Sequence, residues 1–143
     1  MTEWTTYSNS QLSITLQHPW PTPLGHLVNI VEKSSEISYR IHLLTEESSE
    51  VYFEIGRYHM LPLTKAIHLF QKELTKANSQ MEISPAEATT FATRPAYRLT
   101  ARWPEKERIV TFIDLEGIVY RIIYDPASAI NQQILESLAF DQP

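Results

Sequence analysis

The chain has 143 residues, with 12 Lys and Arg against 17 Asp and Glu, a formal net charge of −5 and no cysteine. This length suits a single domain over residues 1–143, large enough to bury a core without covalent cross-links. The absence of cysteine excludes a disulfide framework, a thiol nucleophile and cysteine-ligated zinc or iron–sulfur sites. The negative charge argues against nucleic acid as a partner, because neutralising phosphates requires a basic face.

Residues 1–7 contain no Lys or Arg and no apolar run, so they do not resemble a signal peptide. No segment approaches the roughly 18 consecutive apolar residues that a membrane helix needs. We therefore expect a cytoplasmic protein with no membrane span. A net charge of −5 opposes pairing of exposed strand edges only weakly, so we expect a monomer or a weak homodimer.

Alternation of apolar and polar residues predicts strands in the first part of the chain. The clearest alternation covers residues 37–43, and shorter ones cover residues 12–16, 28–30 and 51–55. This series predicts an antiparallel meander with one buried face. Apolar residues then recur at helical spacing from Leu63 to Ala77, with Pro62 in the first turn and Asn78-Ser79 at the end, which predicts a long amphipathic helix.

Strand patterns return between Ala88 and Tyr124. Residues 108–113 are apolar on both faces, as is typical of a central strand covered on two sides. The pair Glu116-Gly117 predicts a two-residue hairpin loop. Asp125 as N-cap, with Pro126 at the first helical position, predicts a second helix. The order of elements predicts an α+β fold in which an antiparallel sheet is covered by two helices, an α/β/α sandwich.

The sequence contains no pattern that favours catalysis or metal binding. None of the five histidines has H-x-H or H-x-x-x-H spacing, and His18 and His26, on either side of the proline-rich segment, have no fixed third ligand. The glycines form neither a P-loop nor a dinucleotide fingerprint, and no nucleophile motif occurs. We therefore expect no cofactor, no bound metal and no catalytic residue; an enzyme that uses His18 or His59 as a base is the least favoured alternative.

A basic stripe stands out in an otherwise acidic chain. Residues 94–124 hold six basic and four acidic side chains, and Arg94, Arg98 and Arg102 share strand parity and so one face. One interpretation is a contact patch for an acidic partner. The other is ordinary cross-strand pairing with three nearby carboxylates, those of Glu105, Glu107 and Glu116.

Three aromatic residues, Trp20, Tyr58 and Trp103, fall where loops leave the predicted sheet. Exposed Trp and Tyr are typical anchors of protein interfaces, although a Trp can equally close the end of a core. Together with Arg98 and Arg102, these residues form the candidate partner surface.

The chain as a whole resembles the Mog1/PsbP/DcrB-like group of small α/β/α sandwich proteins. The resemblance is carried by the corner His18-Pro19-Trp20-Pro21, by residues 94–99 entering a strand, and by a tyrosine-rich strand over residues 117–124 followed by a helix that closes in the pattern I-L-x-S-x-x-F. These are packing residues, so no functional residue is carried over. Members include an extrinsic subunit of photosystem II, a partner of the Ran GTPase, bacterial lipoproteins and effector chaperones, so the resemblance implies binding of another protein without chemistry.

We therefore expect a non-enzymatic cytoplasmic protein-binding module, adaptor-like or chaperone-like, with an unidentified protein partner. The alternative is a carrier that holds a small apolar ligand between helix and sheet. The residues expected to line that cavity are Tyr39, Phe53, Phe70 and Tyr120.

Overall fold

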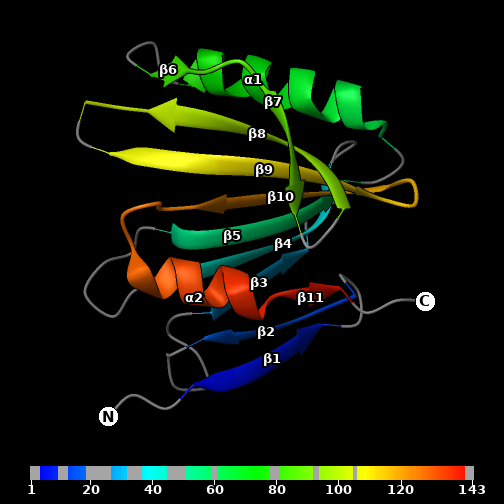
Figure 1. Ribbon diagram of the computed structural model, residues 1–143, viewed down its shortest axis with the longest axis vertical. Helices are drawn as coiled ribbons and strands as arrows, with labels where there is room; N and C mark the ends of the chain where they lie inside the picture. The colour runs from blue at the N-terminus through cyan, green and yellow to red at the C-terminus, as the bar shows by residue number, and fades with distance from the viewer. Residues whose placement is uncertain are drawn as a thin grey trace.

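The computed structural model describes residues 4–9, 13–18, 27–31, 37–44, 51–58, 61–77, 81–91, 94–104 and 106–140. These residues form two helices, α1 (Leu63–Ala77) and α2 (Ala129–Ser137), and two antiparallel sheets (Figure 1). The smaller sheet contains β1 (Thr5–Asn9), β2 (Ile14–His18) and β11 (Ala139–Phe140). The larger contains β3 (Leu27–Val31), β4 (Ile37–Leu44), β5 (Val51–Tyr58), β6 (Glu82–Ile83), β7 (Glu87–Phe91), β8 (Arg94–Arg102), β9 (Glu107–Leu115) and β10 (Ile118–Tyr124).

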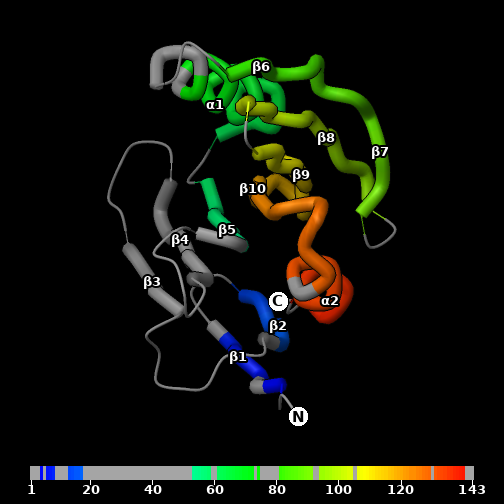
Figure 2. Tube along the Cα trace, turned by 90° about the vertical axis from the view of Figure 1, so that its left-hand side faces the viewer, coloured from blue at the N-terminus to red at the C-terminus, as the bar shows by residue number. Residues whose placement is uncertain are grey.

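The larger sheet has the order β3-β4-β5-β10-β9-β8-β6, and β7 also pairs with β8. Helix α1 packs on one face of this sheet, and α2 packs on the other face together with the smaller sheet (Figures 1 and 2). The predicted α+β class, an antiparallel sheet with a helix on each face, is therefore confirmed.

One strand lies in a different sheet from the one predicted. Residues 14–18 form β2 in the smaller sheet and are not part of the meander. The reason is long-range pairing, since β2 is hydrogen-bonded to β1 on one side and to the C-terminal β11 on the other. Local alternation shows that Ile14 and Leu16 need burial, and both are fully buried, but it does not show which strands lie beside them.

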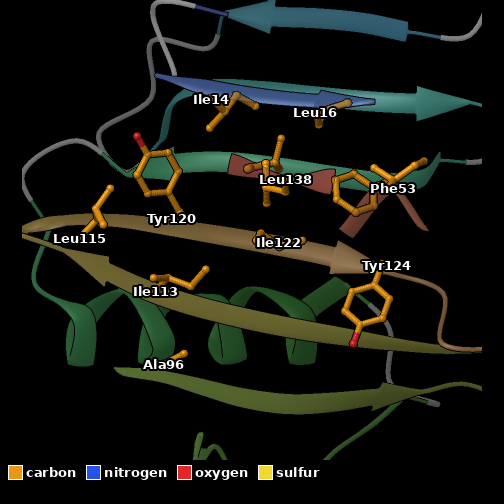
Figure 3. Close-up of a cluster of buried hydrophobic side chains, with 12 residues drawn as sticks. Ile14, Leu16, Phe53, Ala96, Ile113, Leu115, Tyr120, Ile122, Tyr124 and Leu138 are labelled. Carbon is orange, nitrogen blue, oxygen red and sulfur yellow. The ribbon is translucent and has the colours of Figure 1, made fainter. Parts of the chain in front are cut away.

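Two hydrophobic cores lie on opposite faces of the larger sheet, because successive side chains of a strand point to opposite faces. The first core lies against α2 and β2 (Figure 3) and contains Ile14, Leu16, Phe53, Ile55, Ala96, Ile113, Leu115, Tyr120, Ile122, Tyr124, Ile134 and Leu138. The second lies under α1 and contains Tyr58, Ala66, Ile67, Phe70, Leu99, Val110, Phe112 and Val119. In β9, residues 110–113 are all buried, which confirms the prediction of a central strand covered on both faces.

Helix α1 covers the residues for which the apolar stripe predicted it. The carbonyl of Pro62 accepts a hydrogen bond from the amide of Ala66 at 2.9 Å, so Pro62 stands immediately before the helix. Ala66 and Phe70 face the sheet, and His68 lies on the exposed side. Residues 78 and 79, expected to end the helix, lie outside the described residues.

Helix α2 begins three residues later than Asp125 and Pro126 predict. Its N-cap is Ser128, whose Oγ accepts a hydrogen bond from the amide of Asn131 at 3.1 Å. Asp125 instead closes the turn before the helix, because its Oδ1 accepts from the amide of Ala127 at 2.9 Å. The prediction of Asp125 as N-cap is therefore wrong. Asp125 and Ser128 both have side chains that can cap a helix, and in the folded chain Ser128 is the residue that does so.

The hairpin predicted at Glu116-Gly117 is confirmed. It joins β9 to β10, with φ of 53° at Glu116 and 91° at Gly117. Two positive φ angles in a two-residue loop are typical of a type I′ turn, which matches the twist of the flanking strands. The amide of Gly117 also donates to Asp114 Oδ1 at 2.8 Å, which anchors the turn to β9.

Candidate functional site

The candidate site lies on β8, the strand that carries the basic stripe. Tyr97 and Leu99 point toward α1 and belong to the second core or pack against it. Arg98, Thr100 and Arg102 alternate with them and therefore project from the opposite face of the sheet. Helix α2 lies over the β5 side of that face and does not extend over β8, whereas β7 runs along β8 on the same side as α2 and its Phe91 packs against the first core (Figures 1 and 2). We call Arg98, Thr100 and Arg102 the β8 arginine face; both of its arginines are exposed.

Arg102 already has a carboxylate partner. It stands opposite Glu107 in the β8–β9 register, and its Nη2 lies 3.0 Å from Glu107 Oε2. The two side chains are 61% and 38% exposed, and exposed pairs of this kind contribute at most about 1 kcal/mol to stability. The predicted cross-strand pairing is thus confirmed for Glu107. Glu105 lies outside the described residues, and no ion pair within them joins Glu116 to β8.

Arg98 is in a different position. Its register partners are Glu87 on β7 and Thr111 on β9, and within the described part of the chain it forms no ion pair with either Glu87 or any other carboxylate. Its charge instead acts on Tyr124 at the end of β10. Burial raises the pKa of Tyr124, and the nearby Arg98 charge and a hydrogen bond with the Gln132 side chain offset only part of this rise. Arg98 is therefore an exposed cation whose charge acts on the largely buried Tyr124.

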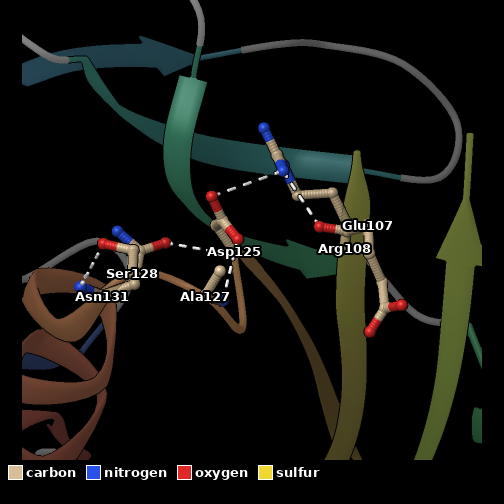
Figure 4. A network of polar contacts seen from close by, with 6 residues as sticks. All are labelled: Glu107, Arg108, Asp125, Ala127, Ser128 and Asn131. Carbon is tan, nitrogen blue, oxygen red and sulfur yellow. Dashed lines mark hydrogen bonds and ion pairs between the residues drawn. The ribbon is translucent and has the colours of Figure 1, made fainter. Parts of the chain in front are cut away.

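The placement of Gln132 beside Tyr124 depends on a polar network between β9 and the start of α2 (Figure 4). Arg108 Nη1 lies 3.7 Å from Asp125 Oδ2, and the amide of Asp125 donates to Asn131 Oδ1 at 2.9 Å. Asn131 is fully buried, so the first turn of α2 is held against the end of β10. The roles of Tyr124 and Gln132 were missed by sequence reasoning, because they depend on where the tertiary fold places α2.

Of the three aromatic residues assigned to the partner surface, Trp103 lies at the end of β8, next to Arg102. Trp103 is partly exposed, follows Arg102 directly, and donates its amide hydrogen to the carbonyl of Lys106 at 2.8 Å, which closes the β8–β9 turn. The Lys106 ammonium lies 5.0 Å from the centre of its ring. Trp20 lies outside the described residues.

The assignment of Tyr58 to the partner surface is wrong. Tyr58 is only 4% exposed and stacks against Phe112 in the second core, on the face opposite Arg98. The physical reason is that Tyr58 belongs to β5 itself, on the face that α1 covers, rather than to a loop beyond the strand.

A buried charged cluster under α1 was not predicted. Arg121 Nη2 lies 2.6 Å from Glu54 Oε1, and Arg121 Nη1 donates to the Tyr58 hydroxyl at 3.0 Å. The guanidinium carbon lies 4.8 Å from the centre of the Phe70 ring. Burial alone would lower the pKa of Arg121, but Glu54 and Tyr58 outweigh burial, so the pKa is raised. Arg121 stands between the apolar Val119 and Ile123 on one strand face, and this pattern indicates that its charge needs a buried partner. The sequence does not show which residue that is, because Glu54 stands 67 residues away. The cluster is enclosed between the sheet and α1.

The described residues hold no group of three or more His, Asp or Glu arranged to bind a metal. A hollow of about 220 Å³ opens on the surface between β6 and β8, lined by Glu82, Ile83, Ser84, Thr100 and Arg102. The residues proposed to line a carrier cavity are not gathered together. Phe53 and Tyr120 lie in the first core and Phe70 in the second, on the other face of the sheet, while the side chain of Tyr39 lies outside the description.

No family model matches the chain, and neither does any curated protein. Among solved structures, the chain is similar to the solution structure of cyanobacterial PsbP (CyanoP) from Synechocystis sp. PCC 6803, with a TM-score of 0.59 and 14% sequence identity. The match covers 98% of this chain and 94% of the CyanoP chain. The fold is PsbP-like. At this identity the likeness concerns the arrangement of the elements and not the side chains of the β8 arginine face. Neither helix in the described part of the PsbP-like chain is long and apolar enough to cross a membrane.

Proposed function

We propose that this PsbP-like chain is a non-enzymatic, cytoplasmic protein-binding module that engages its partner through the β8 arginine face and the adjoining Trp103. The observation that carries the proposal is the part of β8 that α2 does not cover. It presents two exposed arginines and ends at a partly exposed tryptophan. Arginine and tryptophan are enriched among the residues that dominate protein interfaces.

The scaffold holds this face in place before a partner binds. Strand β8 is paired along its length with β9 on one side and with β6 and β7 on the other. Leu99 and Ala101, on its opposite side, are almost fully buried. A partner that docks here therefore loses little free energy to ordering of the backbone, which favours binding by a preformed surface.

Site-specific photocrosslinking in cells tests the proposal. A photoreactive amino acid replaces Thr100 on the β8 arginine face, and in a control chain it replaces Lys72, which is exposed on α1 on the other side of the molecule. We expect a discrete adduct with one protein from position 100 and none from position 72. Equal adducts from both positions, or none from position 100, would contradict the proposal.

Variants then locate the surface with the partner in hand. The triple variant R98E/R102E/W103A is expected to abolish binding, while the melting temperature falls by no more than about 5 °C because exposed side chains contribute little to stability. The matched control is K65E/K72E, two equal charge reversals at exposed positions of α1. Unchanged affinity in the triple variant would show that the surface lies elsewhere. Cell fractionation tests the cytoplasmic location separately.

A further inference from the structure

We propose that Arg98 is the recognition point for a carboxylate, contributed by an Asp or Glu in an extended segment of the partner protein, with the Tyr124 hydroxyl and the Gln132 amide beside it. This inference rests on the proposed function and names the chemistry of its partner. It assigns different roles to the two arginines of the β8 arginine face, because Arg98 binds the carboxylate of the partner and Arg102 remains paired with Glu107.

The first argument is charge balance. Arg102, Arg108 and Arg121 each have a carboxylate partner in the structure. Arg98 has none within the described residues, although Glu87 stands opposite it in the register with β7. A guanidinium carries five N–H donors in a planar fork, which matches the two oxygens of a carboxylate. The exposed Arg98 therefore retains donors that an incoming carboxylate can engage.

The second argument is the surroundings of Arg98. Tyr124 is 6% exposed and is hydrogen-bonded with the side chain of Gln132 on α2. Tyrosine is protonated at neutral pH, and burial raises the pKa of Tyr124 further, so the hydroxyl can donate a hydrogen bond and places no negative charge next to Arg98. Tyr124 and Gln132 are also fixed in position by the contacts between β9 and α2. A carboxylate at Arg98 thus meets one cation and two oriented polar groups.

The third argument concerns which anion fits. Phosphate groups are typically recognised by clusters of several cations. Arg94 and Arg102 are each four residues from Arg98 along β8, which is about 13 Å at the rise of a strand, so the three cations do not converge on one anion. Further along β8, the charge of Arg102 is already matched by Glu107, and Glu82 stands opposite Arg102 on β6. A second acidic residue of the partner would be repelled by the carboxylates of Glu82 and Glu107. The face therefore favours one carboxylate at Arg98 followed by uncharged residues toward Arg102.

Nuclear magnetic resonance titration tests this directly, with two blocked peptides as probes, Gly-Ser-Val-Glu-Val-Ser-Gly and its counterpart with Gln in place of Glu. We expect the Glu peptide to shift the side-chain signals of Arg98 Nε and of the Gln132 Nε2 amide at concentrations up to about 10 mM, and the Gln peptide to shift them at least fivefold less. The variant R98Q should lose the response, and Y124F should weaken it. The matched control R94Q removes an arginine on the same strand face, away from Tyr124, and should retain it.

Three results would overturn the inference: no shift at these signals, equal shifts from the two peptides, or an unchanged response in R98Q. A larger response to inorganic phosphate than to the Glu peptide would also overturn it, because the site would then be one for small anions. The proposed function fails separately. If Thr100 crosslinks to a partner while the Glu peptide leaves Arg98 unaffected, the module binds protein by other contacts, and only the carboxylate assignment falls.

Discussion

The buried pair of Arg121 and Glu54 allows a sharp test of how this fold is stabilised. The substitution Glu54→Gln removes the negative charge and keeps the size of the side chain. The Arg121 and Glu54 side chains are 5% and 12% exposed, so the Arg121 cation would be left in a low-dielectric environment without the carboxylate that balances its charge. The Tyr58 hydroxyl and the Phe70 ring would remain beside it, but neither carries a full negative charge.

The expected magnitude follows from this enclosure. Removing one partner of a buried ion pair costs about 3–5 kcal/mol, and the lower end applies here because Gln still offers an oxygen to Arg121. For a domain of this length, 1 kcal/mol corresponds to roughly 3–4 °C, so the melting temperature of E54Q should fall by about 10 °C. The double variant E54L/R121M should be far less destabilised than E54Q, because apolar side chains often replace a buried pair at little cost. Among the residues that the structure describes, the buried Arg121 Nε has no hydrogen-bond partner, which is a further cost that the double variant removes.

Urea and thermal unfolding followed by circular dichroism measure these differences, with an unchanged urea m-value as the check that the unfolding reaction is the same. The matched control is E107Q, the same chemical change at the exposed Arg102 pair, and it should cost less than about 1 kcal/mol. If E54Q and E107Q cost the same, or if the double variant costs the sum of its two single substitutions, the reasoning from burial is wrong.

Three further predictions concern caps, turns and pH. Ser128→Ala should lower the free energy of unfolding by about 1 kcal/mol by removing the N-cap of α2, and an unchanged midpoint in urea would show that the cap is not needed. Glu116→Asn should raise the free energy of unfolding by about 0.5 kcal/mol, because Asn tolerates the φ of 53° better than Glu. Gly117→Ala should lower it by about 1–2 kcal/mol through backbone strain alone, since a Cβ there would meet nothing within 4 Å. Melting temperatures of the two variants that shift in the same direction would contradict the turn geometry. Because the pKa of Tyr124 is raised in the folded state, the unfolded chain loses this proton first, and stability is lost as the pH rises from about 10 through the folded pKa. Urea unfolding between pH 8 and 11 should show a steeper loss for the wild type than for Y124F, and parallel curves would refute the assignment.

The pattern of residues along the chain was sufficient to predict features that depend on neighbours in sequence. Helix α1 follows from apolar residues at helical spacing, and the β9–β10 turn follows from Glu116-Gly117 between two strands. The position of Arg98 and Arg102 on one face follows from strand alternation alone. Each of these depends on bond geometry that repeats within a few residues, so a single sequence contains it.

The partners of these elements were decided only by the tertiary structure. Alternation in β2 required burial but did not show that β11 would pair with it from the other end of the chain. Tyr58 had the composition of an interface anchor, but α1 covers it and Arg121 binds its hydroxyl. Arg98 and Arg102 have the same residue type and the same strand parity, yet Glu107 neutralises one and leaves the other beside Tyr124. Periodicity determines which face of a helix or strand must be buried or paired. Contacts between segments that are distant in sequence determine what packs against that face, and therefore that Arg102 is paired with Glu107 while Arg98 can bind a partner.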